Sequence, residues 1–116
     1  MKTKKEIRNE YKQMKFRKGV FQIRNKSDGR VYIGSSMNLD KAWNSQKFKL
    51  EAGIHSCGEL QEDYRKSGAD NFIFEIIEVL KETGETEDAE KEIKELEEIC
   101  LMEIQPYGEK GYNKKT

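Results

Sequence analysis

The residue types best suited to metal or nucleophilic chemistry are scarce in this sequence. It contains one histidine, His55, and two cysteines, Cys57 and Cys100. The cysteines form no C-x-x-C pair, and one histidine beside them does not complete the four ligands of a structural zinc site. The sequence therefore excludes a classical zinc domain, and two lone cysteines in a charged chain indicate an intracellular protein with free thiols.

Glu97 is a carboxylate in an unusual position. It lies between Ile93 and Leu101, four residues from each, so in a helix it borders the apolar face. A charge there is costly without a partner or a metal ion. The same segment is rich in glutamate, however, and a carboxylate that simply faces solvent is the alternative. The pattern leaves both interpretations open.

Lysine and arginine gather near the N-terminus. Residues 1–18 contain eight of them against two glutamates, and residues 67–104 contain thirteen acidic residues against three basic ones, although the whole chain is neutral. A basic segment attracts phosphates and an acidic segment repels them. Overall neutrality is unusual for a DNA-binding domain, so the charges alone favour two solvated surfaces.

The length and composition limit the architecture. A chain of 116 residues supports one domain, and 34% hydrophobic against 38% charged residues leaves only a small core. No apolar run approaches the roughly 18–20 residues of a membrane span, and residues 1–5 lack the apolar stretch of a signal peptide. We expect a single domain in the cytoplasm.

A β-hairpin is predicted over residues 19–35. The segments 20–23 and 31–34 are rich in β-branched and aromatic residues, and Asp28-Gly29 between them is a strong turn signal. A third strand is predicted at residues 71–80. This segment is almost continuously apolar, which is typical of a strand covered on most of both faces.

Helical periodicity predicts four helices, one before the hairpin and three after it. They cover residues 3–16, 39–52, a segment that ends at Gly68, and 87–104. Asn38 is a predicted N-cap and Gly53 a predicted C-terminal cap of the second helix. Ser56 and Glu59 have the spacing of a capping box for the third. In the last helix the apolar stripe comprises Ile93, Leu96, Cys100 and Ile104. Strands and helices mix without βαβ regularity, which indicates an α+β fold with a small three-stranded sheet.

Several motifs, in order, resemble the GIY-YIG nuclease superfamily. Gly19-Val20-Phe21 stands where that family has Gly-Ile-Tyr, and Tyr32-Ile33-Gly34 is an intact YIG. Further matches are Leu60–Tyr64, Asn71–Ile77 and the closing Gly111-Tyr112-Asn113. The resemblance implies a small, mostly antiparallel three-stranded sheet flanked by helices over residues 18–113. A basic N-terminal helix in 1–17 and a polar tail at 114–116 lie outside it.

The resemblance also implies a reaction, the metal-dependent hydrolysis of DNA phosphodiester bonds with Mg²⁺ or Mn²⁺. In the family, tyrosines position the attacking water, an arginine stabilises the phosphate, and a glutamate binds the metal ion. Tyr32 matches the second tyrosine, Glu97 the metal-binding glutamate, and Asn113 the asparagine that closes the site. His55 matches a histidine that sometimes lies near that site. Whether the DNA is single- or double-stranded is not specified by the motifs.

Three positions depart from the family pattern. Phe21 lacks the hydroxyl of the first tyrosine, Ala42 stands where the arginine is expected, and Gln46 stands where a histidine usually falls. Loss of one charge-stabilising donor typically costs about 10²–10³ in rate. Lys49 lies two turns beyond Ala42 and is the best-placed substitute, although an ammonium lacks the bidentate geometry of a guanidinium.

Three functions follow as alternatives. The first is an endonuclease with a partly degraded active site. The second is a catalytically silent module that binds nucleic acid, and the third is a protein-interaction or regulatory domain that uses the acidic last helix, for instance in a homodimer. The basic residues expected to contact DNA are Lys12, Lys15, Arg17, Lys18, Lys41 and Lys47.

Overall fold

The computed structural model describes residues 17–80 and 89–114. In chain order they form β1 (Gly19–Asn25), β2 (Val31–Ser36), α2 (Leu39–Ala52), α3 (Gly58–Ser67), a 3₁₀ turn (Ala69–Asn71), β3 (Phe72–Val79), α4 (Ala89–Ile104) and a second 3₁₀ turn (Gly108–Lys110). The basic helix predicted within residues 1–17 lies outside the described part of the chain, apart from Arg17.

The three strands form one antiparallel sheet in the order β2-β1-β3. The predicted hairpin is confirmed. Its turn is closed by the Gly29 amide, which donates to the Asn25 carbonyl at 2.8 Å. Gly29 has a φ of 80°, in the left-handed region that favours glycine. Together with the helices, this sheet confirms the predicted α+β fold.

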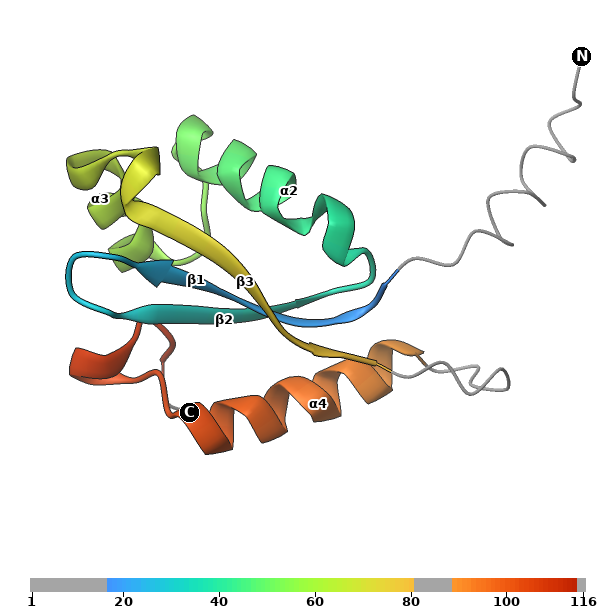
Figure 1. The fold of residues 1–116 in the computed structure, drawn as a ribbon. Helices are drawn as coiled ribbons and strands as arrows, with labels where there is room; N and C mark the ends of the chain where they lie inside the picture. The colour runs from blue at the N-terminus through green and yellow to red at the C-terminus, as the bar shows by residue number, and fades with distance from the viewer. Residues whose placement is uncertain (1–16, 81–88, 115–116) are drawn as a thin grey trace, which may run out of the picture.

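Helices cover both faces of the sheet (Figure 1). α2 and α3 lie on one face, and α4 crosses the opposite face. Val20 and Phe21 are adjacent in β1 and point to opposite faces, so each strand contributes to two separate apolar layers. The predicted helices at 39–52 and 87–104 are thereby confirmed, with α4 beginning at Ala89.

The larger core cluster lies between the sheet and the α2–α3 pair. Its buried members are Phe21, Ile23, Leu39, Ala42, Leu50, Leu60, Tyr64, Phe72 and Tyr112. Trp43 packs against it from the rim and stacks on Phe74 with ring centres 5.7 Å apart. The smaller cluster beneath α4 comprises Val20, Ile33 and Cys100. The predicted α4 stripe is confirmed, since Ile93 and Cys100 are buried.

The prediction that the third strand is covered on most of both faces is wrong, because only its first residue is buried. β3 is an edge strand, because β1 occupies the centre of the sheet. Ile76 and Val79 keep 36% and 43% of their surface exposed. A continuous apolar run is typical of a central strand in a larger sheet, whereas here the helices cover mainly the first half of β3.

Two predicted caps form differently from expectation. Asn38 occupies the N-cap of α2, but its side chain makes no capping bond. The first amide of the helix, at Leu39, donates instead to the Arg17 carbonyl at 2.7 Å, and the Ser36 hydroxyl accepts from the Asn38 amide at 3.0 Å. The capping box at Ser56 is wrong, because α3 begins at Gly58 with Cys57 as its N-cap. Glu59, the other half of that box, pairs with Arg30 of the hairpin at 2.5 Å.

Gly53 ends α2 in the left-handed conformation, as predicted, and its amide donates to the Leu50 carbonyl. Within residues 17–80 and 89–114, no helix is long and apolar enough to cross a membrane.

Candidate functional site

Tyr32, the retained hairpin tyrosine, lies at the centre of the candidate site. Its half-buried side chain packs against the larger core cluster. Its ring meets the ring of His55 edge-on, with ring centres 5.3 Å apart and planes at 78°. The α2–α3 side of the sheet therefore brings together the predicted site residues Tyr32 and His55.

The environment of Tyr32 keeps its phenol protonated. Burial is the largest effect and raises the pKa of the phenol, while the Ser56 side chain acts in the opposite direction. The charges of Cys57 and Glu97 raise the pKa further. At neutral pH the Tyr32 hydroxyl can therefore both donate and accept a hydrogen bond.

His55 is held by hydrogen bonds at both ring nitrogens. It lies in the loop between α2 and α3 and is only 9% exposed. Its Nδ1 accepts from the Cys57 amide at 3.0 Å, and its Nε2 lies 2.6 Å from Oε1 of Gln46. Because Nδ1 acts as an acceptor, the proton of the neutral ring is assigned to Nε2.

The positive charge of Lys49 also acts on His55. Burial, and then the Lys49 ammonium, lower the pKa of the imidazole, so His55 is neutral at physiological pH. Gln46 and Lys49 are one turn apart on α2 and both act on the same ring. Lys49, predicted to substitute for the missing arginine, therefore stands near His55.

Glu97 lies in the other helix layer, on the opposite face of the sheet from α2 and α3. It lies on α4, its side chain is 19% exposed, and its Oε2 is 4.0 Å from Nζ of Lys94. Its charge raises the pKa of the Tyr32 phenol and, as a smaller effect after burial, that of the Cys100 thiol. The carboxylate predicted to bind metal is thus largely shielded from solvent, and no contact joins it to Tyr32 among the described residues.

Asn113 bonds to the backbone of β2. Its Oδ1 accepts from the Ile33 amide at 2.8 Å, and its Nδ2 donates to the Ile33 carbonyl at 2.9 Å. Both side-chain groups are therefore engaged next to Tyr32. These bonds tie the segment after α4 to the hairpin, and Asn113 and Tyr32 line the same small pocket.

The diverged positions Phe21 and Ala42 are both part of the core. Phe21 is 1% exposed and packs on Phe74 with ring centres 5.1 Å apart. Its Cζ lies 2.7 Å from where a Cβ at Gly34 would stand, so the ring requires glycine at that position. Ala42 is 5% exposed. Neither side chain presents a polar group to the candidate site.

The described basic residues predicted to contact DNA lie around the start and middle of α2. Arg17 forms an exposed ion pair with Asp40. Lys47 holds its ammonium 5.7 Å from the centre of the Trp43 ring, and Lys41 is exposed. The Lys18 carbonyl accepts from the Leu80 amide at 2.7 Å. Lys12 and Lys15 lie outside the described residues.

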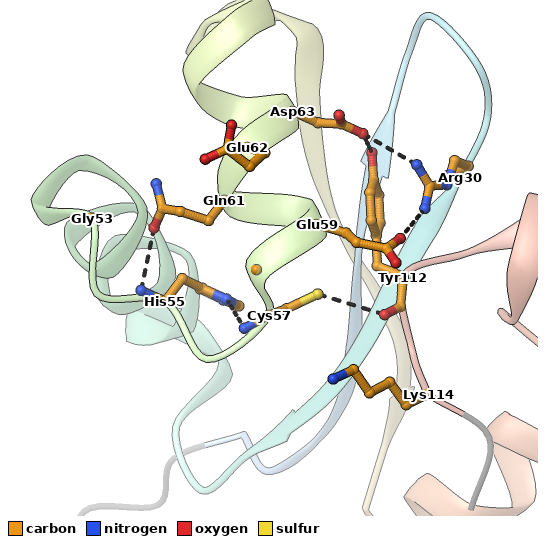
Figure 2. Close-up of a pocket in the computed structure, with 11 residues that line it drawn as sticks. Arg30, Gly53, His55, Cys57, Glu59, Gln61, Glu62, Asp63, Tyr112 and Lys114 are labelled. Carbon is orange, nitrogen blue, oxygen red and sulfur yellow. Dashed lines mark hydrogen bonds and ion pairs between the residues drawn. The ribbon is translucent and has the colours of Figure 1, made fainter.

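An open pocket of about 800 Å³ lies beside the candidate site (Figure 2). His55 and Cys57 line one part of it, and a network around Tyr112 lines another. In that network Arg30 packs over the Tyr112 ring at 4.1 Å from its centre and pairs with Asp63 at 3.3 Å. Since its charges are paired internally, this network contributes mainly to structure.

Sequence reasoning missed two neighbours of Tyr32. Ser56 and Cys57 line the small pocket with it, but the motifs gave them no role. It also missed the bond between Gln46 and His55, because Gln46 was interpreted only as a lost histidine. No periodicity links Gln46, on α2, with His55, nine positions later in the loop that follows the helix.

Glu97 is the one carboxylate that the sequence analysis predicted for the metal site, and it lies among the described residues. Among residues 17–80 and 89–114, no group of three or more His, Cys, Asp or Glu could hold a metal ion. Mg²⁺ is commonly held by one or two carboxylates together with water and phosphate oxygens. Glu97 therefore fits a hard cation shared with a phosphate, and does not fit a closed metal cage.

Comparison with known proteins gives a family match. The model of the GIY-YIG catalytic domain matches residues 17–100. Intron-associated endonuclease 1 of Enterobacteria phage T4 is 38% identical over 50 residues, which cover 43% of this chain and 20% of that protein. The match thus spans about a fifth of the relative's length.

Two solved structures are similar to this chain. A mutant catalytic domain of the intron endonuclease I-TevI superposes with a TM-score of 0.71 at 28% identity, covering 84% of this chain and 93% of that one. The catalytic domain of the homing endonuclease I-TevI has a TM-score of 0.66 at 32% identity, with coverages of 85% and 99%.

Proposed function

Because this chain belongs to the GIY-YIG family, we propose that it is an endonuclease domain that hydrolyses phosphodiester bonds of DNA. The observation that carries the proposal is the position of Tyr32, whose ring meets that of His55 edge-on and which lines one small pocket with Asn113. Residues from β2, the α2–α3 loop and the segment after α4 therefore meet around one phenol.

The proposed reaction adds water to phosphorus and breaks one P–O bond of the backbone. Negative charge builds on the phosphate oxygens as the bond to water forms. The protonated Tyr32 hydroxyl would orient the attacking water, and the Lys49 ammonium would offset part of the phosphate charge. Neutral His55 would hold the Tyr32 ring rather than supply charge.

A divalent cation, Mg²⁺ or Mn²⁺, is part of the proposal. Glu97 would hold it, together with phosphate oxygens and water. When bound, the cation would stabilise the developing charge on the phosphate as a Lewis acid. The support is the donor chemistry: a single shielded carboxylate suits a hard cation that the substrate helps to coordinate.

We also propose that this active site is weakened. Phe21 contributes no hydroxyl, and Ala42 lies in the core without a guanidinium. Removal of one preorganised donor typically lowers the rate by about 10²–10³. Cleavage should therefore be slow, and it should depend strongly on the groups that are retained.

Replacement of Glu97 tests this function. We expect Glu97→Gln to lower Mg²⁺- or Mn²⁺-dependent cleavage of DNA by about 10²–10³, because the amide keeps the shape and loses the charge that would hold the cation. Glu98 is the matched control: it is the exposed neighbour on α4, and Glu98→Gln should cleave like the unmodified chain.

Equal cleavage by the two variants would mean that a contaminating nuclease is measured. Absence of cleavage with every single- and double-stranded substrate and both metal ions would refute the endonuclease function.

A catalytically silent nucleic-acid-binding module is the second candidate. The burial of Phe21 and Ala42 favours it, because neither position offers a group to a substrate. Such a module would bind DNA with an affinity that falls steeply as salt rises, since contacts to phosphates release counterions. Binding with no cleavage would support it, and salt-independent or absent binding would refute it.

We further propose a cytoplasmic location, supported by the free thiols of Cys57 and Cys100. Association into homodimers through the acidic surface of α4 remains a proposal as well. Sedimentation at low and high salt tests it, and a monomer at both would exclude electrostatic association.

A further inference from the structure

Gln46 occupies a position that the family motif assigns to histidine, yet its side chain contacts the histidine that this chain retains. We propose that Gln46 is a positioning residue: its side-chain carbonyl fixes His55 as the neutral Nε2–H tautomer, and the fixed imidazole holds the ring of Tyr32. The consequence for cleavage rests on the proposed endonuclease function, whereas the tautomer does not.

The bonding partners of His55 fix which of its ring nitrogens carries the proton. A backbone amide can only donate, so Nδ1 of His55 accepts the Cys57 N–H at 3.0 Å and carries no proton. Oε1 of Gln46 can only accept, so the proton on Nε2 is donated to it across 2.6 Å. The two contacts therefore require the same tautomer.

The backbone of the loop that carries His55 is fixed by Gln61. Its backbone amide donates to Oε1 of Gln61 at 3.2 Å, and Nε2 of Gln61 donates to the Leu50 carbonyl at 2.6 Å. The backbone of His55 is thus tied to α3 and to the end of α2. With the backbone fixed, the Gln46 side chain at Nε2 and the Cys57 amide at Nδ1 together fix the orientation of the ring.

Among the described residues, no carboxylate lowers the preference of the His55 imidazole for its neutral form. The charged group that acts on it is Lys49 of α2, while Tyr32 of β2 meets it through its ring and Cys57 through its backbone amide. The carboxylate Glu97 acts on Tyr32 and contributes nothing to the pKa of His55. A positive neighbour and burial both oppose a second proton on the imidazole, so the neutral tautomer persists.

The imidazole of His55 contacts the phenol ring of Tyr32 directly. The ring planes of His55 and Tyr32 meet at 78° with centres 5.3 Å apart, an edge-to-face geometry that is favourable and directional. If His55 rotated, it would lose the Gln46 bond and leave the Tyr32 ring without this support. Gln46 thus acts on Tyr32 through His55.

The experiment uses imidazole ¹⁵N–¹H NMR on the untagged full chain. His55 is the single histidine, so every imidazole signal belongs to it. The variants are Gln46→Ala, which removes the acceptor, and Gln46→Glu, which makes it anionic. Asn44→Ala is the matched control, since Asn44 is exposed on the same helix. Circular dichroism checks that each variant is folded.

The unmodified chain should show the Nε2–H tautomer at neutral pH, with slow exchange of that proton. We expect Gln46→Ala to speed the exchange about tenfold or more, because the protecting hydrogen bond is lost. Gln46→Glu should raise the pKa of His55 by about one unit or more, since a carboxylate stabilises the imidazolium. Asn44→Ala should resemble the unmodified chain in both respects.

Cleavage assays separate this inference from the proposed function. Gln46→Ala should lower kcat about tenfold and leave KM unchanged, as expected for a misplaced catalytic group. An Nδ1–H tautomer in the unmodified chain, or unchanged exchange in Gln46→Ala, would overturn the positioning role. The expected spectra without cleavage by any variant would support the Gln46 contact and overturn the endonuclease function.

Discussion

Two tyrosines line the same small pocket, Tyr32 and Tyr112, and they are bonded in different ways. Tyr112 is 3% exposed. Its hydroxyl donates to Oδ2 of Asp63 at 2.7 Å and accepts from Nδ2 of Asn25 at 2.9 Å. Tyr32 is half-buried, and its neighbours are the imidazole of His55 and the groups that shift its pKa.

The difference indicates which phenol is available for chemistry. Tyr112 joins the hairpin, α3 and the segment after α4, and both hydrogen-bonding roles of its hydroxyl are filled within the protein. Tyr32 lies on the α2–α3 side of the sheet, beside His55 and at the wall of the small pocket. Residue type alone would not separate the two, whereas their burial and their bonding partners do.

The largest expected effect is on catalysis. We expect Tyr32→Phe to lower the rate of DNA cleavage by about 10²–10³, because the hydroxyl that would orient water is lost. Stability should change by less than about 1 kcal/mol, since the ring and its contact with His55 remain. Single-turnover cleavage and urea unfolding measure the two quantities. A stability loss as large as that of Tyr112→Phe would erase the distinction between the tyrosines.

At Tyr112 we expect the reverse pattern, a loss of stability with little loss of cleavage, and the effect should be smaller. Tyr112→Phe should lower the free energy of unfolding by about 1–3 kcal/mol, because the buried amide of Asn25 loses its acceptor. Cleavage per folded molecule should stay within about twofold of the unmodified chain. Urea unfolding and cleavage at a temperature where both proteins are folded test this. A loss of activity without a loss of stability would assign Tyr112 to the active site.

The smallest expected effect appears at alkaline pH. Burial and the hydrogen bond to Asp63 raise the pKa of the Tyr112 phenol well above its ordinary value, and the bond from Asn25 only partly opposes them. A tyrosine in the unfolded chain loses its proton near about pH 10, while folded Tyr112 keeps it. The folded state then binds more protons, so stability falls as pH rises above that value.

We therefore expect Tyr112→Phe to lose less stability than the unmodified chain between about pH 8 and pH 11. Part of the alkaline loss should remain, because burial also raises the pKa of Tyr32 and Tyr64. Urea unfolding at both pH values provides the comparison. Parallel losses in the two proteins would show that Tyr112 does not contribute to alkaline unfolding.

Local signals predicted the elements well. The Asp28-Gly29 turn, the Gly53 cap and the apolar stripe of α4 each depend on residues close in sequence, and each was found. The motif order also predicted the family. These features follow from backbone preference and hydrophobic periodicity, which a single sequence displays directly.

Contacts between elements were not predictable in the same way. Glu59 had the spacing of a capping box, but the Arg30 guanidinium offered it an ion pair from a distant hairpin. The bond between Gln46 and His55 likewise depends on how the loop after α2 returns to it. The edge position of β3 followed from sheet order, which its apolar composition does not encode.

The segment after α4 has a consequence for the edge of the sheet at β2. Gly111 bridges to Val31, the Tyr112 amide donates to the Val31 carbonyl, and Asn113 brackets Ile33. These bonds occupy the outer side of β2, which would otherwise be an open template for strands of other molecules. Removal of Gly111–Asn113 would uncover this part of the β2 edge at Val31 and Ile33.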